Sequence, residues 1–285
     1  MGRMIEGTQG DDKLHQPHFR WPWEGRNDVY KGYDGNDRIE AGDDDNQIFG
    51  GNGNDTLEGR GGLDTLHGGE GNDVISGQDG DDYLSGDAGD DHLSGGSGNN
   101  ILEGGSGNDD LSVEEGNNYL DGGTGNDQLA GGTGNDILLG REDHDHLFGR
   151  GGDDILIGGK GNNYVDGGSG KDTFVLTRGG NDWILDFSVG EDKIAFGTAS
   201  GSAVDLIIGS SRGEAALVHK DRPGEIIAVL NNIGFNEIKI NDQGLIVSHQ
   251  PSKDELSDLD PAAMLFDEVQ GNSGFALLGG SGPCC

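Results

Sequence analysis

The chain has 285 residues, of which only 31% are apolar and 6% aromatic, and 53 acidic side chains against 18 basic ones give it a net charge of −35. An ordinary globular domain is about 45–50% apolar, so this composition excludes a conventional enzyme with a large apolar core. The charge excludes a nucleic-acid-binding protein, and no apolar run approaches the ~18 residues of a membrane-spanning helix. Such a chain is expected to be disordered unless something else, such as bound metal, stabilises it.

Residues 1–31 contain two imperfect copies of a nine-residue unit, at 7–15 and 23–31, separated by the insertion QPHFRWP at 16–22. The N-terminus has no apolar stretch, so we expect no cleaved signal peptide there. The aromatic residues Phe19, Trp21 and Trp23 either cap the first turn of the repeats or form a loop that contacts carbohydrate.

Residues 32–175 divide into sixteen consecutive nonapeptides without an insertion, and this block holds 32 acidic and six basic residues, a balance of −26. Position 8 is apolar in every copy, which predicts one buried side chain in a short strand whose neighbours point outward. Position 4 is Gly in fourteen copies, and position 6 is Asp in twelve and Asn in four. Glycine-rich turns let the backbone adopt positive φ and direct successive carbonyl groups towards one point.

Carboxylates and free carbonyl oxygens in such turns are the ligands that Ca²⁺ prefers. Magnesium requires a tighter octahedron, and zinc requires His or Cys, which the repeat does not supply. The repeat therefore predicts a chain that binds several calcium ions.

Copies such as GGNGNDTLE (50–58) and GGTGNDILL (131–139) match the pattern GGxGxDxUx, and by them the chain resembles the RTX (haemolysin-type) calcium-binding proteins. The resemblance implies an all-β fold, a parallel β-roll with two nonapeptides per turn and calcium ions between stacked turns. It also implies that turn carbonyls and the position-6 aspartates bind the metal, which here are Asp37, Asp55, Asp64, Asp73, Asp82, Asp91, Asp109, Asp127, Asp136, Asp145, Asp154 and Asp172.

With two copies per turn, alternate copies stack on opposite edges of the roll. The first edge carries Asp37, Asp55, Asp73, Asp91, Asp109, Asp127, Asp145 and Asn163; the second carries Asn46, Asp64, Asp82, Asn100, Asn118, Asp136, Asp154 and Asp172. Because Asn keeps a carbonyl ligand but loses the charge, we expect weak or empty calcium sites at the Asn copies, and three of the four lie on the second edge.

Residues 176–249 alternate short β-rich runs with turns and resemble the region that closes the roll in serralysin-type proteins, which implies a small β-rich cap. Asp182, Asp186 and Asp192 are candidates for a terminal calcium site. We expect the cap to cover an outward apolar strip formed by Ile137, Leu139, Ile155 and Ile157. Residues 250–285 are interpreted as a tail, in which the resemblance to RTX proteins implies an uncleaved export signal although the tail has no motif for one. Cys284 and Cys285 form no disulfide framework.

We expect a secreted, extracellular protein without catalytic activity, whose partners are calcium, a type I secretion exporter and a carbohydrate or cell-surface ligand. The chain has no HExxH motif, and the GxSxG match at 209–213 is interpreted as a hairpin turn. His144 and His146 could bind a transition metal, but we interpret them as solvated turn histidines. Two alternatives stay open: the accessory module of an exported protease, lipase or epimerase, and a spacer in an adhesion or surface-layer protein.

Overall fold

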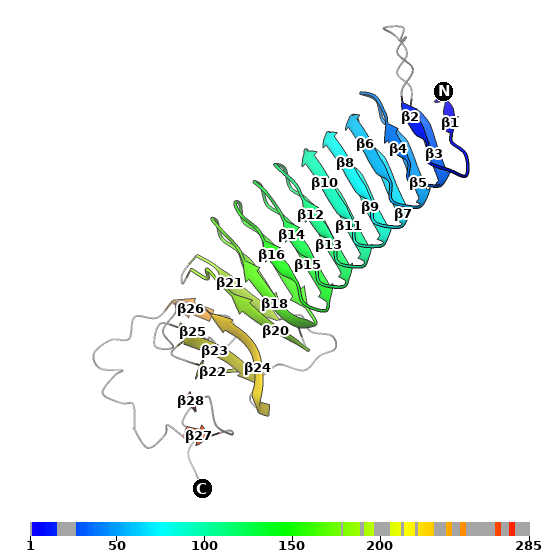
Figure 1. The fold of residues 1–285 in the computed structure, drawn as a ribbon. Coiled ribbons are helices and arrows are strands. Elements are labelled where there is room, and N and C mark those ends of the chain that lie inside the picture. The colour runs from blue at the N-terminus through cyan, green and yellow to red at the C-terminus, as the bar shows by residue number, and fades with distance from the viewer. Residues whose placement is uncertain are drawn as a thin grey trace.

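The computed structural model describes residues 2–15, 27–177, 179–188 and 191–196, together with seven strands further along the chain. The insertion at 16–22 with Phe19 and Trp21, the following Trp23, and the cysteines Cys284 and Cys285 lie outside the described residues. Short strands follow one another through two long sheets that face each other as a roll (Figure 1). Within the described segments no helix is long and apolar enough to cross a membrane.

The odd-numbered strands form an 11-stranded sheet, sheet A, in the order β1 (Met4–Glu6), β3 (Val29–Asp34), β5 (Gln47–Asn52), β7 (Thr65–Glu70), β9 (Tyr83–Ala88), β11 (Ile101–Ser106), β13 (Tyr119–Thr124), β15 (Ile137–Glu142), β17 (Ile155–Gly159), β19 (Thr173–Leu176) and β21 (Lys193–Phe196). Every pair of neighbouring strands in sheet A is parallel.

The even-numbered strands begin a 13-stranded sheet, sheet B, in the order β2 (Lys13–His15), β4 (Arg38–Glu40), β6 (Thr56–Gly61), β8 (Val74–Asp79), β10 (His92–Ser97), β12 (Asp110–Ser112), β14 (Gln128–Ala130), β16 (His146–Phe148), β18 (Gly161–Asp166), β20 (Gly180–Ile184), β24 (Arg222–Leu230), β23 (Glu214–His219) and β22 (Leu206–Ser211). The last three strands pair as an antiparallel meander. Two separate hairpins pair β25 (Ile238–Ile240) with β26 (Ile246–Ser248) and β27 (Phe266–Glu268) with β28 (Gly274–Ala276).

The strand register confirms two nonapeptides per turn of a parallel roll. Along the block each residue pairs with the residue 18 positions later, as Leu102 does with Leu120. At the N-terminal end Met4 pairs with Val29, an offset of 25 that equals 18 plus the seven residues of the insertion. At the other end the offset grows to 19 between β18 and β20 and to 20 between β19 and β21. Both sheets therefore continue beyond residues 32–175 in each direction.

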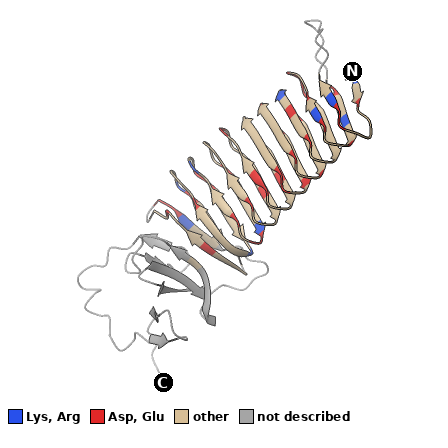
Figure 2. Ribbon diagram, in the orientation of Figure 1, with Lys and Arg blue, Asp and Glu red and all other residues tan. Residues whose placement is uncertain are grey.

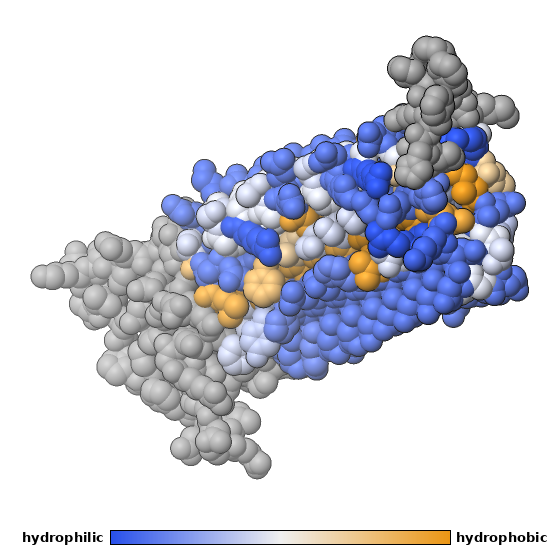
Figure 3. All heavy atoms as spheres, turned by 45° about the horizontal axis from the view of Figure 1, so that its top comes forward, coloured by the Kyte–Doolittle hydropathy of each residue, from blue (hydrophilic) through white to orange (hydrophobic). Residues whose placement is uncertain are grey.

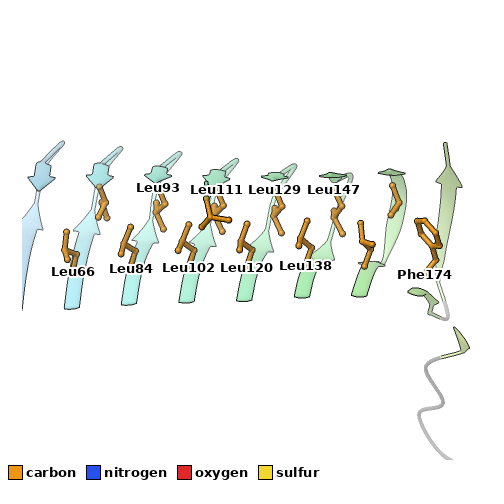
Figure 4. Packing of buried hydrophobic residues seen from close by; sticks show 14 of the residues in the cluster. Leu66, Leu84, Leu93, Leu102, Leu111, Leu120, Leu129, Leu138, Leu147 and Phe174 are labelled. Atoms are coloured by element: carbon orange, nitrogen blue, oxygen red, sulfur yellow. The ribbon is translucent and has the colours of Figure 1, made fainter. Parts of the chain in front are cut away.

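The position-8 side chains form the core, as the repeat predicts. They are fully or almost fully buried, and they lie in two facing rows, one from each sheet (Figure 4). Leu66, Leu84 and Leu102 belong to one row, and Leu93 and Leu111 to the other. Each position-8 side chain packs against its counterparts one turn away and against the facing row. The core therefore receives one position-8 side chain from each nonapeptide, and its buried apolar area grows only with the number of turns.

The outward faces of the two sheets are mixed in character. Acidic residues recur along the length of the roll with few basic ones (Figure 2), and apolar residues form a band on the face turned to the viewer in Figure 3. The sequence predicts that the cap covers the apolar strip of Ile137, Leu139, Ile155 and Ile157. The side chains of Ile137 and Ile155 are exposed, at 37% and 39%, so the prediction is wrong for these two residues. The chain after residue 176 instead extends the sheets end to end, through β20 beside β24.

Candidate metal centre

All twelve aspartates predicted from position 6 lie at the edges of the roll and are buried, with at most 3% of each residue exposed. Each stands immediately before a strand, because the glycine-rich turn ends at position 5 and the extended chain begins at position 7. The first edge leads into sheet B and the second edge into sheet A. The structure thus brings the twelve residues together as two rows rather than as one cluster.

The two oxygens of each carboxylate have different surroundings. Oδ1 accepts the backbone N–H of the position-6 residue one turn earlier; for example, Asp73 N donates to Asp91 Oδ1 at 2.7 Å, and Asp91 N donates to Asp109 Oδ1 at 2.8 Å. This bond repeats from turn to turn along both edges. Oδ1 therefore has a structural role, because it joins successive turns and fixes the orientation of the carboxylate.

The second oxygen of each carboxylate has no hydrogen-bond partner although it is buried. This holds for Oδ2 of Asp37, Asp55, Asp64, Asp73, Asp82, Asp91, Asp109, Asp127, Asp136, Asp145, Asp154 and Asp172, the same twelve residues that the sequence predicts as ligands. A buried acceptor without a partner is costly, and more so when it is charged. Twelve such atoms in one repeated position form an arrangement that a bound cation would satisfy.

The glycine at position 1 leaves open the space that such a partner needs. A Cβ atom built on Gly50 would lie 2.2 Å from Asp55 Oδ2 and 2.6 Å from the carbonyl oxygen of Gly68 in the next turn. On Gly104 the corresponding distances are 2.5 Å to Asp109 Oδ2 and 2.6 Å to the Gly122 oxygen. No side chain fits there, whereas calcium–oxygen distances of about 2.3–2.6 Å do. The residues present therefore fit calcium.

Burial raises the pKa of these carboxyl groups, and backbone hydrogen bonds only partly oppose it. The pKa rises to about 7 for Asp64, Asp73 and Asp109, and to about 6 for Asp55 and Asp127. For Asp73 and Asp109 the negative charges of neighbouring turns contribute to the same direction. The ionised carboxylates are thus unfavourable in this position unless a cation compensates them.

Within the described residues, no group of three or more acidic, His or Cys side chains is arranged so that the side chains alone could hold a metal ion. One carboxylate per turn would therefore bind the metal together with backbone carbonyl oxygens. This is the hard oxygen environment of calcium, and it lacks the His and Cys ligands that zinc requires.

A comparison with protein families finds the RTX calcium-binding nonapeptide repeat, each match covering four copies, at residues 24–57, 58–93, 76–111, 85–120, 103–138, 112–147, 139–174 and 148–184. The chain belongs to this RTX family. The family assignment confirms the resemblance seen in the repeat, and with the parallel sheets it identifies a calcium-binding β-roll. A comparison with curated proteins finds no match.

The RTX roll has a second hydrogen-bond ladder, at position 5, that the sequence reasoning missed. The backbone N–H of Asn54 donates to Asn36 Oδ1 at 2.7 Å, and that of Asn72 donates to Asn54 Oδ1 at 3.0 Å. His144 joins this ladder, because its Nδ1 accepts the N–H of Asn162 at 2.9 Å. The sequence carries a signal for this ladder, because position 5 is Asn or Asp in thirteen of the sixteen copies. This outer ladder is exposed to solvent.

At both ends of the RTX roll, aspartate oxygens accept hydrogen bonds from donors of the chain itself. The Arg3 guanidinium pairs with Asp28 Oδ2 at 2.7 Å, and the Thr8 N–H donates to Asp12 Oδ2 at 2.6 Å. At the other end both oxygens of Asp186 accept backbone N–H groups, and so do both oxygens of Asp192. The suggestion that Asp182, Asp186 and Asp192 bind a terminal calcium stays a prediction, and so does the likeness of this region to serralysin-type proteins.

Proposed function

We propose that this RTX protein is exported as a disordered chain and folds outside the cell when it binds several calcium ions at its two edges. The observation that carries the proposal is the two rows of buried, unpartnered aspartate Oδ2 atoms, twelve in all among the described residues. A type I secretion exporter suits a chain of this kind, because a chain that is unfolded where calcium is scarce can thread through a narrow channel.

The chain's own residues account for the dependence on metal. Successive turns are about 4.8 Å apart, so the aspartates of each edge repel one another when they are ionised. Their Oδ1 atoms hold the turns in register, while their Oδ2 atoms and the position-1 carbonyl oxygens line the open space. Calcium supplies the positive charge that compensates them. Since each nonapeptide contributes only one position-8 side chain to the core, hydrophobic burial does little to offset the repulsion between the carboxylates.

The test is a calcium titration followed by far-ultraviolet circular dichroism. Protein in excess chelator should give a coil spectrum and should convert to a β spectrum as calcium rises to the 10⁻⁴–10⁻³ M range typical of extracellular modules. Magnesium at the same concentration is the control and should not produce the conversion. A complete β spectrum in excess chelator at neutral pH would contradict the proposal.

We also propose that the described part of the chain performs no catalysis of its own. In support, the first residues of the GxSxG match at 209–213 lie on β22, where Ser210 pairs with Ala215 and Ser211 with Glu214 of β23. A nucleophilic serine of this motif requires a sharp turn from a strand into a helix, not an antiparallel hairpin. Loss of hydrolysis of a panel of esters and peptides on Ser211→Ala would overturn this proposal.

A second candidate function, contact with a carbohydrate at a cell surface, is favoured by a row of rings on sheet B. His146, Tyr164 and Trp183 pair in register on β16, β18 and β20, with ring centroids 5.0 Å and 6.2 Å apart. His146 and Tyr164 are exposed. Such rings offer an apolar surface with polar ends, on which sugar rings pack well.

Affinity electrophoresis in soluble polysaccharides tests this second function. Tyr164→Ala should lose the retardation that the wild-type protein shows. The matched control is Tyr119→Ala, which removes a tyrosine from the same repeat position on sheet A, where its hydroxyl contacts Asp121. Equal retardation of the wild-type protein and Tyr164→Ala would rule out this surface.

A further inference from the structure

The two copies that lack glycine at position 1 are Ala41–Phe49 and Val113–Asp121, and both carry Asn at position 6. Ala41 and Val113 are buried in the apolar core, with 0% and 3% of each residue exposed. Fourteen copies have a residue with positive φ at position 2, whereas Gly42 and Glu114, the position-2 residues of these two copies, do not. The turn therefore follows a different path wherever position 1 carries a side chain.

Val113 closes two sites at once. In its own copy, the Asn118 copy, it places a side chain at position 1, where fourteen other copies have glycine. Its Cγ1 reaches the previous turn, where it would lie 2.8 Å from a Cβ atom built on Gly95, the glycine of the Asn100 copy. This accounts for Asn100, which lacks a carboxylate although its own copy has glycine at position 1.

The asparagine amides complete the closure. In each of these copies Oδ1 keeps the bond between turns, as Asn118 Oδ1 does with the Asn100 N–H at 2.8 Å. Nδ2 replaces the unpartnered Oδ2 with a donor that finds acceptors nearby: Asn118 Nδ2 donates to Gly116 O at 3.1 Å and Asn46 Nδ2 to Gly42 O at 3.0 Å. The amide hydrogens thus face oxygens that a cation would otherwise attract.

We propose that Ala41 with Asn46, and Val113 with Asn100 and Asn118, are metal-free plugs built into the roll. The proposal rests on the proposed calcium function. The plugs divide the calcium sites of the second edge into a pair, Asp64 and Asp82, and a group of three, Asp136, Asp154 and Asp172. The first edge keeps one uninterrupted series of seven from Asp37 to Asp145.

The decisive variant removes the central plug by Val113→Gly, Asn100→Asp and Asn118→Asp together. Equilibrium dialysis at saturating calcium, followed by metal analysis, should find two more ions per chain than in the wild-type protein. Two controls separate the effect of the open space from that of the charge. The first is Val113→Gly alone, and the second is Asn100→Asp with Asn118→Asp while Val113 is kept. Neither control should bind more ions than the wild-type protein. A folded triple variant that binds the wild-type number of ions would overturn the proposal.

The reverse experiment keeps the proposal testable if the triple variant does not fold. Gly104→Val with Asp91→Asn and Asp109→Asn transfers the plug to the same positions of the first edge, and the chain should bind two fewer ions. An unchanged count would overturn the plug. A wild-type chain that binds no calcium would overturn the proposed function and the plug with it, whereas a calcium-binding wild-type chain with no change in either variant overturns the plug alone.

Discussion

The first and second edges of the roll are built from the same nonapeptide and the same turn-to-turn hydrogen bond, yet they differ in what fills the space beside position 6. From Asp37 to Asp145 every copy of the first edge has a buried Oδ2 without a partner. In the second edge such copies are interrupted by turns in which position 6 is asparagine, whose amide at Asn46 and Asn118 donates to a backbone carbonyl oxygen, and position 1 of two of these turns carries the buried side chain of Ala41 or Val113. The comparison teaches that positions 1 and 6 together decide whether a turn needs a cation.

The largest expected effect comes from protonation, because a protonated aspartate is neutral and carries a donor, as asparagine does. The folded-state pKa of Asp64, Asp73 and Asp109 is raised to about 7 from an ordinary 3.8. Protons therefore bind the metal-free fold more tightly than the unfolded chain, and their stabilisation, complete below about pH 4, is lost as the pH rises towards 7.

Chelated protein should accordingly gain β signal in far-ultraviolet circular dichroism as the pH falls from 7 to 4. The calcium concentration at half-folding should fall over the same interval, because protons, like calcium, bind these carboxylates more tightly in the folded chain than in the unfolded one. Light scattering is the control for aggregation. A chelated chain whose β signal does not change, or decreases, between pH 7 and pH 4 would contradict the role given to these carboxyl groups.

The next largest effect is expected for Gly104→Ala on the first edge, because the new Cβ would meet Asp109 Oδ2 and the Gly122 oxygen. Overpacking of this kind costs about 1–3 kcal/mol, and the loss of a calcium site adds to it. Gly61→Ala is the matched control, since its Cβ would have no neighbour closer than 3.8 Å. We expect the calcium midpoint to shift for Gly104→Ala only, and equal shifts would show that the open space has no special role.

A smaller difference is expected between Asp91→Ala and Asn100→Ala. Both variants lose one bond between turns, 2.7 Å from Asp73 N in the first case and 2.9 Å from Asp82 N in the second. Only Asp91→Ala also loses a proposed calcium ligand, and a site at tenfold excess of calcium over its dissociation constant contributes about 1.4 kcal/mol. The calcium concentration at half-folding should therefore be higher for Asp91→Ala than for Asn100→Ala. Indistinguishable midpoints would contradict the proposed difference between the two edges.

The smallest effect is expected away from both edges, on the outward face of sheet A. Ile155→Thr replaces a 39% exposed side chain with another β-branched residue, so the free energy of unfolding should change by no more than about 0.5 kcal/mol. Leu138→Ala, in the fully buried core of the neighbouring strand, should cost about 2–5 kcal/mol. Urea unfolding in saturating calcium measures both. A large loss of unfolding free energy in Ile155→Thr would indicate that this side chain is covered, contrary to the structure.

The resemblance to the RTX family implied the parallel roll with two copies per turn. The sequence by itself determined the nine-residue period, the buried position 8 and the aspartates at position 6. Those features depend on sterics within one nonapeptide, repeated sixteen times. A glycine turn, an apolar position 8 and an acidic position 6 have the same local consequence in each copy, so the pattern reveals them without knowledge of neighbours.

Only the tertiary structure decided how the two oxygens of each aspartate divide their roles, that Val113 fills the space of Asn100 thirteen residues before it, and that Arg3 pairs with Asp28 across the insertion. It also decided that Ile137 and Ile155 face outward without a cover. These contacts join different turns, and they depend on the 18-residue register and on the end-to-end extension of the sheets. No property of a single nonapeptide contains that information, because a side chain meets its counterpart only after the chain has gone once around the roll.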